Sequence, residues 1–401
     1  MLSVQEALDH LLSHATPIAQ SDQVGTLAAC GRVLAETVQA GIDVPPADNA
    51  AMDGYAVRTR DYHPGALLPV AQRVAAGARA APLAPGSAAR IFTGAPLPPG
   101  ADAVVMQEHC RVEAGGVALL HPPAAGEHVR RRGEDIRGGG VLLAAGTRLR
   151  PQELAYAAAA GVAQLRVTRR PRVAMLFTGA ELATPGAALA PGQIYNANRY
   201  ALGALLHGLG CETTDFGIVD DRLDATRATL REAAAGHDLV ISSGGVSVGE
   251  EDHVKAAVAA EGTLDVWKVA MKPGKPLAFG ALRRREGSSA HFIGLPGNPV
   301  ASFVAFALFA RPFILRMQGV ERVHQQALPM RAGFACGHAD GRTEFLRVRV
   351  NGAGLLEPVA QQGSALLHSL VQADGLAVRE PGLVIGHGDI VPYLPFDALL
   401  A

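Results

Sequence analysis

This chain has few cysteines, almost no net charge and no long apolar run. Its 401 residues include only four cysteines, Cys30, Cys110, Cys211 and Cys336, and none lies close to another in sequence. This spacing argues against a zinc knuckle or a disulfide framework and indicates reduced structural thiols. The formal net charge is −1, so no global field favours nucleic acid or an anionic membrane. Because no uninterrupted run of ~18 apolar residues occurs, we expect no transmembrane helix.

The first residues also lack the basic start of a signal peptide. Ser3 and Glu6 have the spacing of a capping box, and Leu8, Leu11 and Leu12 fall on one face of a helix. We therefore expect a capped helix here rather than a leader, and a cytoplasmic protein.

What the chain has in quantity is apolar residues, at 49%, together with 46 glycines and 26 prolines. This composition is typical of a folded protein with many turns, and a prior of ~150 residues per domain predicts two to four domains. Apolar runs, turn residues and helical patterns predict an α/β multidomain fold with four parts. These are a discontinuous, mainly helical domain (1–45 plus 136–168), a β-rich insert (46–135), a doubly wound α/β domain (169–319) and a small C-terminal β-barrel (320–401).

The α/β domain contains three unusual segments: SSGGVSVGEED at 242–252, MKPGKP at 271–276 and GLPGNPVAS at 294–302. Each follows an apolar, strand-like run, and Val173–Phe177 reads as a strand buried on both faces. Alternation of strands and helices favours a mostly parallel sheet with ligands at the carboxyl ends of its strands. We therefore expect the three segments to meet at one edge.

Their residues suit an active site for a phosphate ester, a divalent metal and a second oxyanion. Glycine turns before helices supply backbone N–H donors to anions. Glu251 and Asp252 supply carboxylates, and Lys272 and Lys275 supply positive charge. The two lysines could instead decorate a proline turn.

Other motifs leave alternatives open. AMDGYAV at 51–57 and FTGAPLPPGADAVV at 92–105 could be turn chemistry alone. Asp135 follows an arginine run at 130–132, and such a run is more typical of a solvated face than of a site. The alternative to a role of Asp135 in a site is therefore an ion pair with these arginines. Asp221 could cap a helix together with Asp224.

With TGAEL, SSGGVSVGEED, KPGKP and LPGNPVAS, and with AMDGYAV, TGAP and GEDI upstream, the chain resembles the molybdopterin molybdenumtransferase family of the MoeA and gephyrin E-domain type. The resemblance covers nearly the whole chain in the family's order. One departure is Ala180, which stands where the family often has Asp, and this puts any role of that carboxylate in doubt.

The resemblance implies the last step of molybdenum cofactor synthesis, in which adenylylated molybdopterin and molybdate react with Mg²⁺ present to give the cofactor and AMP. It implies that Glu181, Asp221 and Asp252 hold metal or orient water, and that Asp53, Thr93 and Asp135 take part in catalysis. It places molybdate among Lys272, Lys275, Ser302, Arg347 and Ser364. The remaining expected binding residues are in the glycine loops: Thr178, Gly179, Ser243, Gly244, Gly245, Val246, Ser247, Pro296, Gly297, Asn298 and Pro299.

The family also implies a two-fold homodimer with shared active sites and transient contact with other cofactor-biosynthesis or acceptor proteins. Three other functions compete with this interpretation. An adenylyltransferase would resemble residues 172–318 alone, a gephyrin-like scaffold would not need the acidic and lysine residues, and a metal-dependent phosphohydrolase is the fallback. Molybdenum and tungsten are not distinguished by the sequence, and neither are the acceptor proteins.

Overall fold

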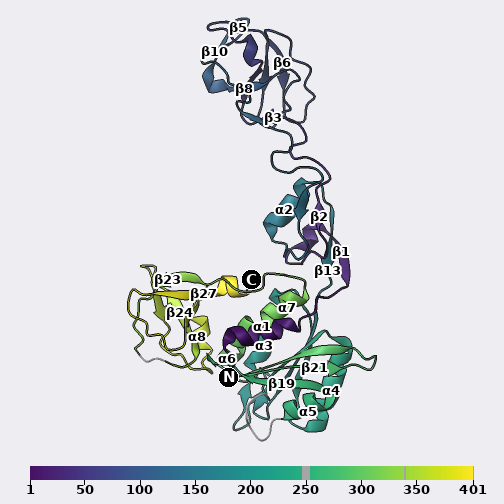
Figure 1. Cartoon of the computed structure of the whole chain (residues 1–401), viewed down its shortest axis with the longest axis vertical. Helices are drawn as coiled ribbons and strands as arrows, with labels where there is room; N and C mark the ends of the chain where they lie inside the picture. The colour runs from purple at the N-terminus through teal and green to yellow at the C-terminus, as the bar shows by residue number, and fades with distance from the viewer. Residues whose placement is uncertain (246–252, 338–339, 401) are drawn as a thin grey trace. The chain divides into compact units, whose positions relative to one another are not determined.

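The computed structural model describes residues 1–245, 253–337 and 340–400, and these form two compact units. One unit comprises Met1–Asp22, Gly31–Ala35 and Val167–Ala401, and the other comprises Gln23–Cys30 and Glu36–Arg166. Figure 1 shows the elements of each unit. The finer division into four domains stays a prediction.

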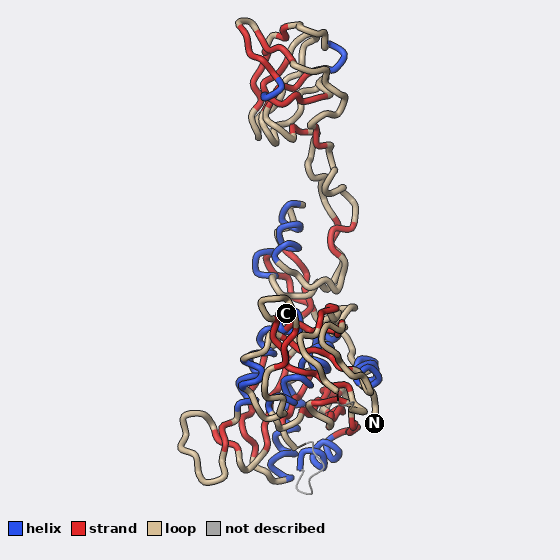
Figure 2. Tube along the Cα trace, turned by 90° about the vertical axis from the view of Figure 1, so that its left-hand side faces the viewer, coloured by secondary structure: helices blue, strands red, loops and turns tan. Residues whose placement is uncertain are grey.

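The second unit is rich in short strands, as its turn-bounded apolar runs predicted. A four-stranded sheet has the order β6-β7-β4-β8 and a three-stranded sheet the order β5-β10-β9. Figure 2 colours this region mainly as strand and loop. The strands are β4 (Gly54–Val57), β5 (Leu67–Leu68), β6 (Val70–Val74), β7 (Ala88–Ile91), β8 (Ala103–Met106), β9 (Cys110–Glu113) and β10 (Gly116–Leu119).

Gly54 explains the Asp-Gly pair of AMDGYAV. It pairs with Met106 across β4 and β8, and a Cβ at this position would lie 1.9 Å from the Val105 carbonyl oxygen. Because that carbonyl belongs to the backbone of the neighbouring strand, only glycine allows this approach.

The rest of this unit consists of short strand pairs and one helix. α2 (Pro151–Ala159) has proline in its first turn, where no N–H donor is needed, and Gly161 follows it with φ +79°. The short pairs are β2 (Val38–Gln39) with β12 (Val141–Leu143), and β3 (Asn49–Ala50) with β11 (Val129–Arg130). β1 (Ser21–Gly25) and β13 (Gln164–Thr168) lie where the chain passes from one unit to the other.

The first unit is built on a six-stranded sheet of order β17-β14-β18-β22-β21-β19. Neighbours from β17 to β22 are parallel, whereas β21 is antiparallel to both β22 and β19. Only β21 therefore runs in the reverse direction, which confirms a mostly parallel sheet. The strands are β14 (Arg172–Thr178), β17 (Glu212–Val219), β18 (Leu239–Ser243), β19 (Gly262–Lys268), β21 (Pro276–Arg283) and β22 (Ser289–Leu295).

Alternate side chains of each central strand enter different cores, so helices cover both faces. On one face Val173, Met175 and Phe177 pack with α1, α3 and α6 to α7, and on the other Ala174 and Leu176 pack with α4 and α5. This is the doubly wound arrangement that the sequence predicted. The helices are α1 (Val4–Ser13), α3 (Ala197–Gly208), α4 (Leu223–Gly236), α5 (His253–Glu261), α6 (Pro299–Ala305) and α7 (Arg311–Met317).

Two of these helical segments bear on earlier expectations. α1 has the predicted capping box, in which Ser3 Oγ accepts from the Glu6 N–H and Glu6 Oε2 accepts from the Ser3 N–H. The run Pro299–Met317, in which a π-helical turn (Phe306–Ala310) joins α6 to α7, is long and apolar enough to cross a membrane. However, 78% of the 18-residue apolar window within it is buried inside the protein, as in a core helix.

The C-terminal strands form the predicted small barrel. β23 pairs with β27, β27 with β26, β26 with β24, and β24 with β25. A bridge between Ala332, directly after β23, and Leu356 of β25 closes this ring. β20 (Met271–Lys272) pairs in parallel with the first two residues of β24, Thr343 and Glu344. The C-terminal elements are β23 (Leu328–Arg331), β24 (Thr343–Val350), β25 (Leu356–Pro358), β26 (Gly375–Arg379), β27 (Ile390–Pro395), α8 (His368–Val371) and α9 (Phe396–Leu400). A separate parallel pair, β15 (Leu182–Ala183) with β16 (Ile194–Tyr195), lies between β14 and α3 in the chain.

Candidate active site

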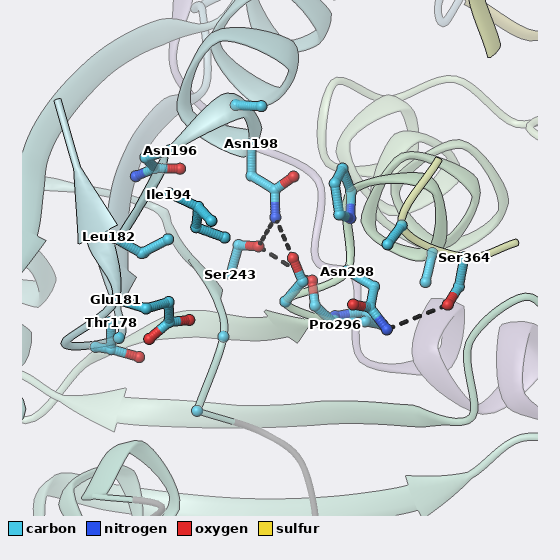
Figure 3. A pocket seen from close by; sticks show the side chains of 18 of the residues that line it. Thr178, Glu181, Leu182, Ile194, Asn196, Asn198, Ser243, Pro296, Asn298 and Ser364 are labelled. Atoms are coloured by element: carbon cyan, nitrogen blue, oxygen red, sulfur yellow. Dashed lines mark hydrogen bonds between the residues drawn. The ribbon is translucent and has the colours of Figure 1, made fainter. Parts of the chain in front are cut away.

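A pocket of about 920 Å³ lies at the carboxyl ends of the parallel strands. The loops after β14, β18 and β22 contribute to it (Figure 3). The loop after β17 and the turn between β19 and β21 also line it. That turn reaches the same edge because β19 runs in the direction of the parallel strands. One further loop, at Ser364 and Ala365, comes from the C-terminal part.

The structure brings thirteen of the expected site residues to this pocket. They are Thr178, Gly179, Glu181, Asp221, Ser243, Gly244, Gly245, Lys275, Pro296, Gly297, Asn298, Pro299 and Ser364. The roles expected of them stay predictions. Val246, Ser247, Glu251 and Asp252 lie outside the described residues.

Gly244 shows why the first loop needs glycine. Its φ is +96°, a left-handed conformation that other residues rarely adopt, and an added Cβ would lie 2.6 Å from the Thr178 carbonyl oxygen. The backbone after β18 therefore lies directly against the end of β14, and both Thr178 and Gly244 line the pocket.

Asn198, at the start of α3, connects the two glycine loops, and the sequence analysis missed it. Its Nδ2 donates to Ser243 Oγ at 2.8 Å and to the Gly297 carbonyl at 2.7 Å, while the Ser243 hydroxyl donates to the Pro296 carbonyl at 3.1 Å (Figure 3). Asn198 is 8% exposed. The sequence shows only an asparagine here, and the burial that makes hydrogen-bond partners necessary is visible only in the structure.

The loop at Ser364 is fastened from two sides. Ser364 Oγ accepts from Asn298 Nδ2 at 3.2 Å, and its carbonyl accepts from the Val300 N–H at 3.0 Å. Behind the loop, Arg347 is buried and donates to the Gly363 carbonyl at 3.2 Å. Burial lowers the pKa of Arg347 from its usual value. Arg347 thus supports the Ser364 loop.

Arg347, Ser302 and Lys272 are not among the described residues that line the pocket. Ser302 is buried, with its Oγ 3.5 Å from Ser243 Oγ. Lys272 Nζ donates to Glu344 Oε1 at 2.7 Å. These three residues lie beside or behind the lining, whereas Lys275 lies on it.

Glu181 and Asp221 are the two described carboxylates of the expected metal site, and both line the pocket. The capping alternative for Asp221 is wrong, because α4 begins at Leu223 and its N-cap residue is Arg222. Within the described ranges no group of three His, Cys, Asp or Glu side chains converges as a metal site. The two carboxylates are nevertheless the hard oxygen donors that Mg²⁺ takes alongside water and substrate phosphate.

Asp53 and Thr93 lie in the other compact unit and contact each other. Asp53 Oδ1 accepts from the Thr93 N–H and from its hydroxyl, both at 2.8 Å. These hydrogen bonds hold the pKa of Asp53 below its usual value. Asp53 therefore fastens the Thr93 turn, and its carboxylate is charged at neutral pH.

Asp135 lines a different pocket of about 450 Å³ in the same unit, with Asn49, Arg130 and Glu134. The neighbouring arginines are paired with other carboxylates: Arg131 with Asp48 at 2.7 Å and Arg132 with Asp43 at 2.5 Å. Two arginines of the run, Arg131 and Arg132, thus form partly exposed ion pairs, as on a solvated face.

Comparison with known proteins follows the same layout along the chain. Residues 2–161 match the MoeA N-terminal region (domain I and II), 174–316 a probable molybdopterin binding domain, and 330–396 the MoeA C-terminal region (domain IV). The molybdopterin molybdenumtransferase of Haemophilus influenzae is 37% identical over 100% of both chains. That of Nostoc sp. is 43% identical over 79% of this chain and 74% of its own.

A solved structure of a MoeA protein is similar to this chain over nearly its whole length. The molybdopterin biosynthesis MoeA protein of Pyrococcus horikoshii OT3 has a TM-score of 0.83 at 28% identity, covering 98% of this chain and 99% of its own. With every region matched in order, the chain belongs to the molybdopterin molybdenumtransferase family, of the MoeA type.

Proposed function

We propose that this protein is a molybdopterin molybdenumtransferase that inserts molybdate into adenylylated molybdopterin, with release of AMP. The observation that carries the proposal is that Glu181, Asp221, Lys275 and the two glycine loops line one and the same pocket. Full-length relatives with this name support it.

The glycine loops hold the dinucleotide's phosphates. Gly245 has no side chain, so its backbone N–H group can approach an anion closely, whereas the Gly244 N–H donates to the Leu295 carbonyl at 3.2 Å and fixes the loop after β18 against β22. Asn198 keeps the loop after β18 at a fixed position relative to the loop after β22. The two loops therefore form one preorganised cradle, which is how a protein stabilises developing charge without reorganising during the reaction.

Glu181 and Asp221 are the described residues that hold Mg²⁺, together with Asp252, which lies outside the described ranges. Mg²⁺ held by these carboxylates would supply positive charge to the phosphate oxygens of the substrate. The two carboxylates come from the ends of different strands, β14 and β17, and both line the pocket that Lys275 also lines.

The substrate oxyanion is surrounded by five residues, of which two line the pocket: Lys275 and Ser364, with Lys272, Ser302 and Arg347 next to them. An ammonium group is a compact point charge that suits a tetrahedral dianion. Arg347 acts by holding the Gly363–Ser364 loop.

We also propose a cytoplasmic homodimer. Asp53, Thr93 and Asp135 lie in one compact unit and the pocket lies in the other, so the family's shared-site dimer gives these residues a catalytic place. Transient contact with other cofactor-biosynthesis proteins or acceptors completes the proposal.

Incubation of the purified protein with adenylylated molybdopterin, molybdate and Mg²⁺, with AMP measured by chromatography, tests the function. AMP release should require both molybdate and Mg²⁺ and should stop in excess chelator and in the variants Glu181→Gln and Asp221→Asn. Release that is unaffected by chelator would remove the metal role. Formation of adenylylated product from ATP and molybdopterin would instead identify an adenylyltransferase.

A further inference from the structure

Glu344 is a buried carboxylate that joins two cations from different segments. It lies on β24 directly across from Lys272 of β20, and its side chain is 4% exposed. Its Oε1 accepts from Lys272 Nζ at 2.7 Å, and its Oε2 accepts from Arg379 Nη2 on β26. One carboxylate of the barrel thus holds a lysine expected at the oxyanion subsite.

The charge of Glu344 is balanced without Lys272. Arg379 is as buried as Glu344, at 4% exposure of its side chain, so these two ions neutralise each other inside the barrel. Lys272 is 49% exposed. The other carboxylate close to Lys272, Asp340, is paired with Arg342 at 2.8 Å. The cluster of Lys272, Glu344 and Arg379 therefore holds Lys272 in position and keeps one net positive charge.

The position of Lys272 also affects Lys275. The two lysines bracket the turn at Pro273 and Gly274, and Gly274 and Lys275 line the pocket. The first end of this turn is attached to β24 by the Lys272–Glu344 contact and by the Thr343 N–H, which donates to the Ala270 carbonyl at 2.9 Å. The second end is attached by the Val269 N–H, which donates to the Lys275 carbonyl at 2.8 Å.

We propose that Glu344 is a positioning residue of the oxyanion subsite, which fixes the Lys272 ammonium and the turn up to Lys275 while leaving both positive charges available to molybdate. The inference rests on the proposed function. Glu344 itself does not touch the substrate, so it acts through Lys272.

Two variants separate position from charge. Glu344→Asp keeps the carboxylate but shortens it by one methylene, and the double variant Glu344→Gln with Arg379→Gln removes the buried ion pair with no change in net charge. Each should raise the KM for molybdate about 3- to 30-fold, part of what a lost charge-assisted hydrogen bond costs. The KM for the dinucleotide and kcat should stay within about two-fold.

Lys272→Ala provides the background that identifies the route of the effect. If Glu344 acts through Lys272, Glu344→Asp should change the molybdate KM no further once Lys272 is alanine. The matched control is Glu357→Gln, which breaks the exposed pair with Arg349 on the same barrel and should leave every KM unchanged. An unchanged molybdate KM in both Glu344 variants, or an equal rise in the Lys272→Ala background, would overturn the proposal.

Direct calorimetric titration with molybdate separates this inference from the proposed function. If the wild-type protein releases no AMP, the proposed function fails, yet weaker molybdate binding in the Glu344 variants would still support the positioning role. If the wild type is active and the variants bind molybdate as it does, only the role of Glu344 is wrong. Thermal unfolding shows which variants are folded. If Glu344→Asp does not fold, the Glu344→Gln/Arg379→Gln double variant provides the test.

Discussion

Asn198 donates one amide hydrogen to Ser243 Oγ at 2.8 Å and so links the start of α3 to the end of β18. The other hydrogen goes to the Gly297 carbonyl at 2.7 Å, after β22. One side chain thus sets the spacing of the two glycine loops that form the pocket floor.

Asn198→Ala should lower kcat/KM for the dinucleotide about 10- to 100-fold, because two buried acceptors lose their donor and the loops are no longer linked. Asn198→Asp is nearly the same shape but places a carboxylate against the Gly297 carbonyl, so it should be at least as damaging. Steady-state kinetics and thermal unfolding measure both variants. Activity of Asn198→Asp equal to that of the wild type would show that the donor is dispensable.

Lys275→Ala should weaken molybdate use far more than dinucleotide binding. The variant removes one charge from the pocket lining while the Gly244–Gly245 loop stays intact, and one charge-assisted hydrogen bond corresponds to about 10- to 100-fold in apparent molybdate affinity. Initial rates over a molybdate series give the value. Lys268→Ala is the control, since Lys268 is exposed at the end of β19 and outside the pocket lining; an equal loss in both variants would contradict the assignment.

Asp238→Asn should change the pH dependence of stability. Burial raises the pKa of Asp238, but hydrogen bonds from the Arg169 guanidinium, at 3.0 Å to each oxygen, and from the Arg172 N–H outweigh it, so the pKa lies below its usual value. A lowered folded-state pKa gives stability that is present above the unfolded value of about 4 and is lost as pH falls through the folded value.

At pH 7 we therefore expect Asp238→Asn to cost about 1–3 kcal/mol of unfolding free energy, because it removes a half-buried, two-point ion pair. The difference from the wild type should shrink as the pH falls below about 4. Urea unfolding at several pH values measures it. Glu212→Gln breaks an exposed pair with Arg172 at 3.5 Å and should cost little at any pH; a constant Asp238→Asn difference down to pH 2 would show that the carboxylate's charge is not the cause.

The features that could be predicted well from the sequence are formed by residues that lie close together in the chain. The capping box of Ser3 and Glu6 lies within one helical turn, and the unbroken apolar run that marks β14 as buried lies within the stretch Val173–Phe177. The edge at which the glycine segments meet followed from parallel strands, since their carboxyl ends share one side. The reversed strand β21 was not predicted, because its apolar residues are the same whichever direction it runs.

Long-range pairs were the other gap. Lys272 and Glu344 are 72 residues apart, and nothing near Glu344 marks it as the partner of a lysine. Asn198 meets Ser243 across 45 residues. Asp53 was expected in catalysis from its motif, but its contact with Thr93, 40 residues away, shows that it also has a structural task. Such partners depend on which strands become neighbours, and local spacing does not encode that.

The two tasks of Asp53 lead to a test of the proposed dimer. A structural role predicts that Asp53→Ala loosens the Thr93 turn within its own subunit. A shared site predicts that Asp53 of one subunit acts with Asp221 of its partner. Each of the variants Asp53→Ala and Asp221→Ala should be inactive alone, since each site would lack one carboxylate.

Unfolding and refolding the two variants together in equal amounts distinguishes these roles. If sites are shared, a mixed dimer has one site with both changes and one with neither; about half of the dimers are mixed, so about a quarter of all sites should recover. If each site belongs to one chain, every site keeps one change and no activity returns. Native mass spectrometry verifies that mixed dimers form, and AMP release measures the recovered sites. Inactive mixed dimers would reject the shared site and leave Asp53 with the Thr93 turn as its only function.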